Sequence, residues 1–169
     1  MFPKMFLQNL TFREAFIVLQ QIISEKPELE AFIFQVAQRV VTDFSDEEIV
    51  GAVYKNLYSL DVEDIYNNSG KSNYGYVEPT EYANEMLVEV IEPYIDEMKK
   101  YHERKMMVEV KKYCLGIIKG LKKFSECDSE FVEWVFDDIH QIMEEIFDEY
   151  KALNPKSEDI AEIEYLLEE

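Results

Sequence analysis

The side chains that most often carry out catalysis are scarce in this chain. It has two cysteines, Cys114 and Cys127, and two histidines, His102 and His140. The spacing of the cysteines is neither that of a CxxC pair nor that of a disulfide framework. So few candidates do not specify a Cys-His nucleophile, and no strand-to-helix elbow presents a serine. The sequence therefore predicts no catalytic residue and does not indicate an enzyme.

Carboxylates are abundant, which raises a carboxylate-bound metal enzyme as an alternative. A di-iron helical bundle repeats Glu-x-x-His on two helices, but Lys99 and Asp137 stand three positions before His102 and His140. His140, Asp137 and Glu144 could hold one ion on a helix surface, although a solvated charged face explains the same residues. We predict no metal site and no cofactor, and the question of a metal near His140 stays open.

Gly70, Lys71 and Ser72 resemble the end of a phosphate-binding loop. In that motif backbone amides and a lysine cradle phosphates. The first glycine of the motif would fall at Ile65, and no strand is predicted before the loop. An ordinary turn is the better interpretation.

Helical signals follow one another along almost the whole chain. Capping boxes at Thr11–Glu14 and Ser45–Glu48 each predict a helix start. Apolar residues at three- and four-residue spacing predict helices near 12–24, 27–43, 45–58, 79–102, 106–124, 128–153 and 157–167. No segment alternates apolar and polar residues over the length of a strand. We expect an all-α fold of about seven helices in antiparallel hairpins, arranged as a bundle or a short array resembling helical repeats.

The length of 169 residues suits one domain, so we predict a single helical domain spanning 1–169. Residues 67–78 are rich in Asn, Ser and Gly, which predicts an exposed central loop between two helical halves. No apolar run reaches the roughly 18 residues of a membrane span. The apolar start has neither a basic segment before it nor a cleavage site after it, so we expect a cytoplasmic protein with no membrane partner.

Acidic residues outnumber basic ones by 36 to 17, and the net charge is −19. Within this acidic chain, residues 99–123 hold nine basic and two acidic residues. This basic hairpin either pairs with acidic helices inside the fold or forms a docking patch, and the sequence leaves both open. Lys119, Lys122 and Lys123 are its candidate partner-binding residues.

Aromatic residues supply the other candidates for partner binding. Trp134 falls outside the apolar stripe of its helix, so it is either covered by another helix of the chain or exposed as an anchor for a partner. Six of the eleven tyrosines lie within residues 54–82, and Tyr74 and Tyr76 sit in the predicted central loop. Phenol groups of this kind are common at binding surfaces.

Together, these features of the sequence favour the interpretation that the chain is a non-catalytic helical interaction or adaptor protein. It would bind a protein partner, or form a homo-oligomer, through its acidic surface and its Tyr-rich central region. The alternative is a role with nucleic acid, either through the basic 99–123 hairpin or through acidic mimicry of a phosphate backbone. The sequence names neither the partner nor the pathway.

Overall fold

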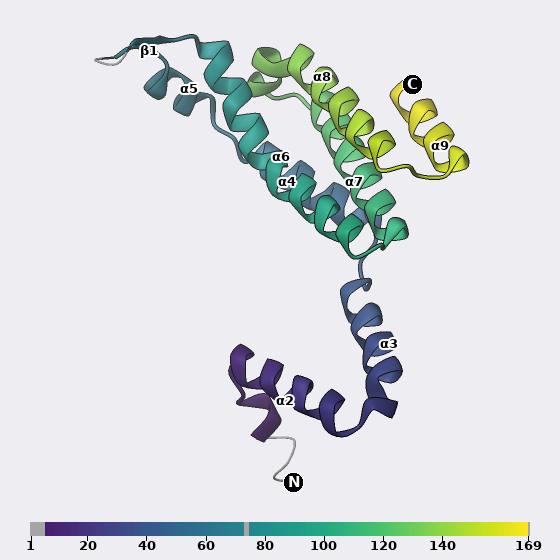
Figure 1. Cartoon of the computed structure of the whole chain (residues 1–169). Helices are drawn as coiled ribbons and strands as arrows, with labels where there is room; N and C mark the ends of the chain where they lie inside the picture. Colours follow the sequence, from purple (N-terminus) through teal and green to yellow (C-terminus); the bar gives the residue numbers. More distant parts are fainter. Residues whose placement is uncertain (1–5, 73–74, 169) are drawn as a thin grey trace. The chain divides into compact units, whose positions relative to one another are not determined.

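The computed structural model describes residues 6–72 and 75–168, which are helical over most of their length (Figure 1). The all-α class predicted from the sequence is confirmed. The chain divides into two compact units, a first unit of residues 1–44 and a second unit of residues 45–169. We describe each unit separately.

From residue 12 onward, the first unit consists of two α-helices joined by a short 3₁₀ turn. These are α2 (Phe12–Glu25), the 3₁₀ turn η1 (Pro27–Leu29) and α3 (Glu30–Val41). The capping box predicted at Thr11 starts α2: its hydroxyl accepts from the amide of Glu14, and the Glu14 carboxylate accepts from the amide of Thr11. No residue of α2, η1 or α3 is buried.

The second unit contains the hydrophobic core. Its elements are α4 (Asp46–Tyr58), α5 (Val62–Asn68), β1 (Gly70–Ser72), β2 (Gly75–Val77), α6 (Pro79–Glu103), α7 (Met107–Ser125), α8 (Glu130–Ala152) and α9 (Ser157–Glu168). The capping box predicted at Ser45 and Glu48 starts α4, and Pro79 occupies the start of α6, where a missing amide hydrogen costs nothing. These ends therefore follow from local chemistry.

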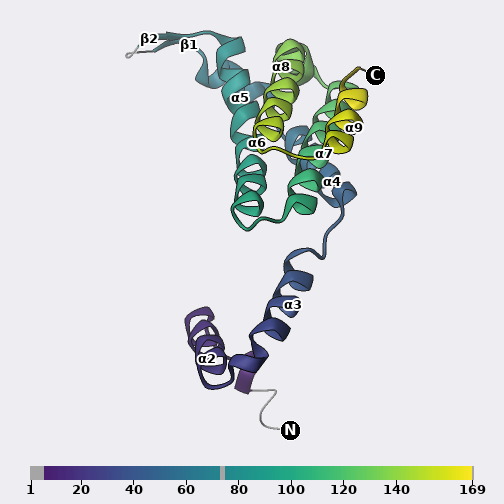
Figure 2. The ribbon, with the colours of Figure 1, turned by 45° about the vertical axis from the view of Figure 1, so that its right-hand side comes forward.

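Helix α7 is the central helix of the second unit and contacts α4, α6, α8 and α9 (Figures 1 and 2). Its fully buried side chains include Ile117, Ile118, Leu121 and Phe124. From α8, Ile139 and Tyr150 complete the core, and neither is exposed. Phe136 belongs to the apolar stripe of α8 by its spacing but lies exposed, in edge contact with His140.

Two glycines let α4 approach α7 closely. A Cβ atom at Gly116 would lie 2.6 Å from the Cβ of Ile49, and one at Gly120 would lie 2.7 Å from Cγ1 of Val53. Both separations are far shorter than van der Waals contact. The packing of α4 on α7 therefore depends on the absence of side chains at these two positions.

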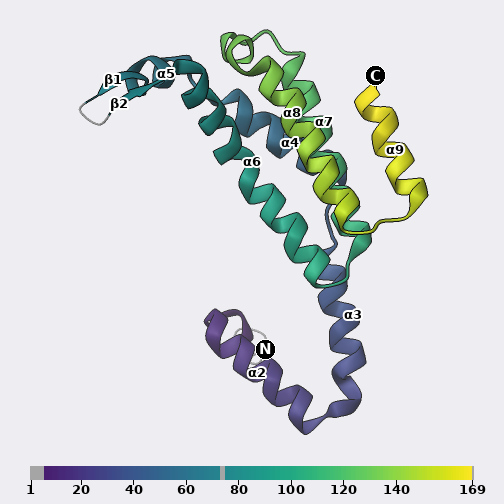
Figure 3. The same cartoon turned by 45° about the horizontal axis from the view of Figure 1, so that its top comes forward.

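The segment predicted as a central loop lies within the second unit. Its first residues end α5, and the strands β1 and β2 pair as an antiparallel hairpin with Lys71 opposite Tyr76. Gly70 has a φ of 89°, which a residue without a side chain adopts readily. In all three ribbon views this hairpin extends away from α7, α8 and α9 (Figure 3).

Candidate interaction surface

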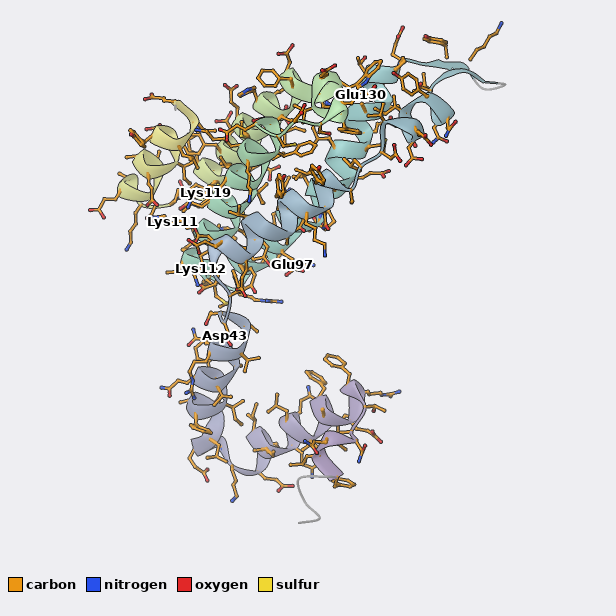
Figure 4. All side chains as sticks on the ribbon, turned by 180° about the vertical axis from the view of Figure 1, so that it is seen from behind. Asp43, Glu97, Lys111, Lys112, Lys119 and Glu130 are labelled. Carbon is orange, nitrogen blue, oxygen red and sulfur yellow. The ribbon has the colours of Figure 1, made fainter. Side chains whose placement is uncertain are left out.

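Two lysines of α7 pair with acidic residues on neighbouring helices of the second unit. Lys119 donates to Asp46 at the start of α4 over 2.8 Å. Lys111 lies 2.6 Å from Asp159 and 2.7 Å from Glu162, both on α9. Lys111 and Lys119 are labelled among the α7 side chains in Figure 4. For these two residues the structure favours internal pairing, one of the two alternatives left open by the sequence.

These ion pairs alter the acidity of their members. The hydrogen bond from Lys119 lowers the pKa of Asp46 from its ordinary value. The hydrogen bonds to Asp159 and Glu162 raise the pKa of Lys111. Both shifts favour the charged forms that make the bridges, so the pairs persist over the neutral range.

Other basic residues of the 99–123 segment also have partners inside the second unit. Lys122 donates to the carbonyl of Leu166 over 3.1 Å, and the ammonium group of Lys123 lies 4.6 Å from the ring centre of Tyr54. Lys99 of α6 pairs with Glu149 of α8 at 3.2 Å. The candidate residues Lys119, Lys122 and Lys123 thus each serve a contact within the fold, and their role in partner binding stays a prediction.

Trp134 is half-buried on α8, and its ring meets Tyr66 of α5 edge-on, with ring centres 5.9 Å apart. This contact agrees with partial cover by another helix of the chain. Tyr66 itself is 60% exposed, and Tyr76 of β2 is 62% exposed. Exposed phenol rings therefore lie on α5 and on the hairpin strand β2. Tyr74 lies outside the described residues.

The second unit has a groove of about 230 Å³ between α6 and α8. Its apolar lining comes from Val88, Ile91, Ile95, Ile142 and Ile146. Its charged lining comes from Glu92, Asp96, Lys99, Glu145 and Glu149. We call this feature the acidic groove, because Lys99 is already paired with Glu149 and the other three charged residues are carboxylates.

The acidic groove is not evident from the sequence alone. Glu92 and Glu145 lie more than fifty positions apart, and only the packing of α6 beside α8 brings them to one surface. Each helix does show acidic residues beside its apolar stripe, but that pattern is also the ordinary pattern of a solvated helix. To predict such a groove, one must know which faces of the two helices pack against each other.

Cys114 lies buried in the core of the second unit. Burial raises the pKa of Cys114 to about 12, so this thiol stays protonated and unreactive at neutral pH. Within residues 6–72 and 75–168 no three His, Cys, Asp or Glu side chains converge as metal ligands would. Over the same residues, no helix has the length and apolar character needed to cross a bilayer.

A protein surface that binds by shape and charge needs neither a nucleophile nor a metal. The acidic groove and the exposed tyrosines of the second unit are the features of this kind that the geometry provides. Comparison with protein families, curated proteins and solved structures found no match to this chain.

Proposed function

We propose that this chain is a non-catalytic helical interaction protein that binds basic protein segments. The acidic groove between α6 and α8 is the observation that carries this proposal. It combines an apolar floor with a rim of carboxylates, and that combination suits a helix with apolar residues on one side and lysines or arginines around them.

The size of the acidic groove favours a protein partner over a small molecule. Small-molecule sites usually have volumes of about 300–1,000 Å³, whereas this groove has about 230 Å³. A volume of this size accepts one or two protruding side chains. Val88 is exposed and Ile91 is fully buried, so the floor is apolar from its edge to its base.

Charge beyond the groove also favours a basic partner. Residues 45–169 carry thirteen basic and 31 acidic residues, a net charge of −18. Such a field attracts a cationic segment and repels an anionic one, mainly by changing the rate of association. The exposed rings of Tyr66 and Tyr76 supply further contact area of the kind that partners use.

The alternative role, in nucleic-acid binding, has less support. One of its two routes uses the basic 99–123 hairpin, and Lys111, Lys119 and Lys122 of that segment are engaged with groups of α4 and α9. The other route, acidic mimicry of a phosphate backbone, stays a prediction. A lysine that leaves such a pair for a phosphate loses its present partner, so the net gain is small.

The test measures binding of a synthetic amphipathic peptide, with leucines on one face of its helix and lysines on the other, by calorimetry. A groove variant replaces three rim carboxylates by their amides: Glu92→Gln, Asp96→Asn and Glu145→Gln. Because exposed charge pairs contribute about 0–1 kcal/mol each, affinity should fall about tenfold. Binding to the unchanged protein should weaken as salt rises.

A matched control removes the same charge elsewhere in the second unit, through Glu103→Gln, Glu164→Gln and Glu168→Gln. These residues are exposed and do not line the acidic groove. The control should keep nearly the affinity of the unchanged protein. Equal losses in the two variants would show that the peptide senses only net charge, and the groove would then lose its assigned role.

A further inference from the structure

The first unit exposes an unusual amount of apolar surface for a pair of helices in water. No residue of α2, η1 or α3 is buried, although both helices are amphipathic. On α2 the apolar residues Phe12, Ala15, Phe16, Val18, Leu19, Ile22 and Ile23 share one broad face. Helices of 12 to 14 residues are marginal in isolation, so their stability has to come from covering such a face.

The exposed area is large enough for a stable interface. Five of the described phenylalanines of this unit, Phe6, Phe12, Phe16, Phe32 and Phe34, are between 52% and 90% exposed, whereas Phe44 is half-buried. A fully buried aromatic side chain covers about 150–250 Å², so these rings present roughly 500–800 Å² in total. Phe32 and Phe34, two positions apart on α3, contribute to different sides of that helix. A standard interface buries about 800 Å² on each partner. Leucine, isoleucine and valine side chains of the same helices add to this area.

Charge distinguishes the first unit from the rest of the chain. Residues 1–44 carry four basic and five acidic residues, a net charge of −1, whereas residues 45–169 carry −18. Two copies of this protein repel each other wherever their second units approach. Two first units can meet almost without that repulsion.

The bend between α2 and α3 also shapes the apolar surface. A groove of about 740 Å³ lies there, lined mainly by apolar residues that include Ile23, Pro27, Ile33 and Phe34. An exposed aromatic ring such as that of Phe16 could insert into this groove on a second copy of the chain.

We propose that the first unit is a self-association module, and that a second copy of this chain covers the apolar faces of α2 and α3. The first unit of a second copy supplies the same apolar face, an apolar area of the order that a standard interface buries, and a net charge near zero. This surface is separate from the acidic groove, so the inference stands independently of the proposed function.

Analytical ultracentrifugation of the full chain over a wide concentration range tests the proposal. A species of twice the 20.1 kDa chain mass should form. Its dissociation should become harder as salt rises, because salt screens the repulsion between the acidic second units but leaves apolar contact intact. A mass of one chain at every concentration and salt level would overturn the proposal.

Two substitutions on α2 form a matched pair. Phe16 lies on the apolar face and is 52% exposed, whereas Ile17 points to the opposite side of the helix and is 49% exposed. Phe16→Asp should weaken association about 100-fold or more, since it acts in both copies at once, and Ile17→Asp should have little effect. Equal effects of the two substitutions would contradict the proposed interface.

Circular dichroism checks that both variants keep their helix content, and thermal unfolding checks the second unit, which holds every buried residue in the part of the chain that the structure describes. Neutral phosphatidylcholine vesicles test a different occupant. A chain that stays a single copy and sediments with these vesicles would assign the apolar face to a membrane surface and overturn the proposal.

Discussion

Gly116 and Gly120 show how strongly single positions constrain this fold. Glycine is among the poorest helix formers, yet α7 carries two of them one turn apart on the side facing α4. A side chain at either position would overlap Ile49 or Val53. The cost in helix propensity is offset by the close packing of two helices.

We expect Gly116→Ala to destabilise the protein by about 1–3 kcal/mol through overpacking, despite the better helix propensity of alanine. Gly51 of α4 is the matched control, because a Cβ atom built there has no neighbour within 4 Å. Gly51→Ala should stabilise by about 0.5–1 kcal/mol. Urea unfolding of the two variants measures both changes, and a gain in both would show that α4 can shift away from α7.

The position of a residue on its helix can be predicted from the sequence, but its contacts with other helices cannot. Trp134 was recognised as lying off the apolar stripe of α8, because that follows from helical spacing alone. Its contact with Tyr66 could not be predicted, since it depends on how α5 packs in three dimensions. The same applies to Lys111, whose partners Asp159 and Glu162 are distant in sequence.

Among the elements, helices with local start signals were predicted well. Both predicted capping boxes are present, and the predicted starts near Pro79 and Ser157 agree with α6 and α9. The short strands β1 and β2 were not predicted, because three-residue strands show no alternating pattern. The acidic groove was missed for a different reason: it is a property of two helices together.

Helix α9 is attached to the second unit through few groups. These are the buried Ile163, the bridges from Lys111 to Asp159 and Glu162, and the bond from Lys122 to the carbonyl of Leu166. We expect Ile163→Ala to accelerate hydrogen exchange of residues 157–168 at least about tenfold, because truncation of a buried isoleucine removes apolar contact and leaves a cavity.

Exchange in α4 and α7 should change much less in this variant, and Glu164→Ala, at an exposed position of α9, should leave the helix protected. Mass spectrometry of peptic fragments resolves these regions. Similar acceleration in α4, α7 and α9 would show instead that α9 unfolds together with the core.

At the scale of the whole molecule, the buried residues among those that the structure describes lie in the second unit. Residues 45–169 produced alone should therefore fold, with a melting temperature within a few degrees of that of the full chain at low concentration. Circular dichroism during heating measures this. A molten or unfolded fragment would mean that residues 1–44 contribute to the stability of the core.

The division at Phe44 and Ser45 also has a consequence for how the gene can change. Codons for the second unit are under the joint constraint of one close-packed interior, so a substitution there is accepted only if its neighbours allow it. In the first unit, a substitution mainly has to preserve the amphipathic pattern of the helices, and many sequences have such a pattern. Related genes should therefore diverge faster over the codons for residues 1–44 than over those for residues 45–169, and recombination at this boundary could exchange one unit while leaving the other intact.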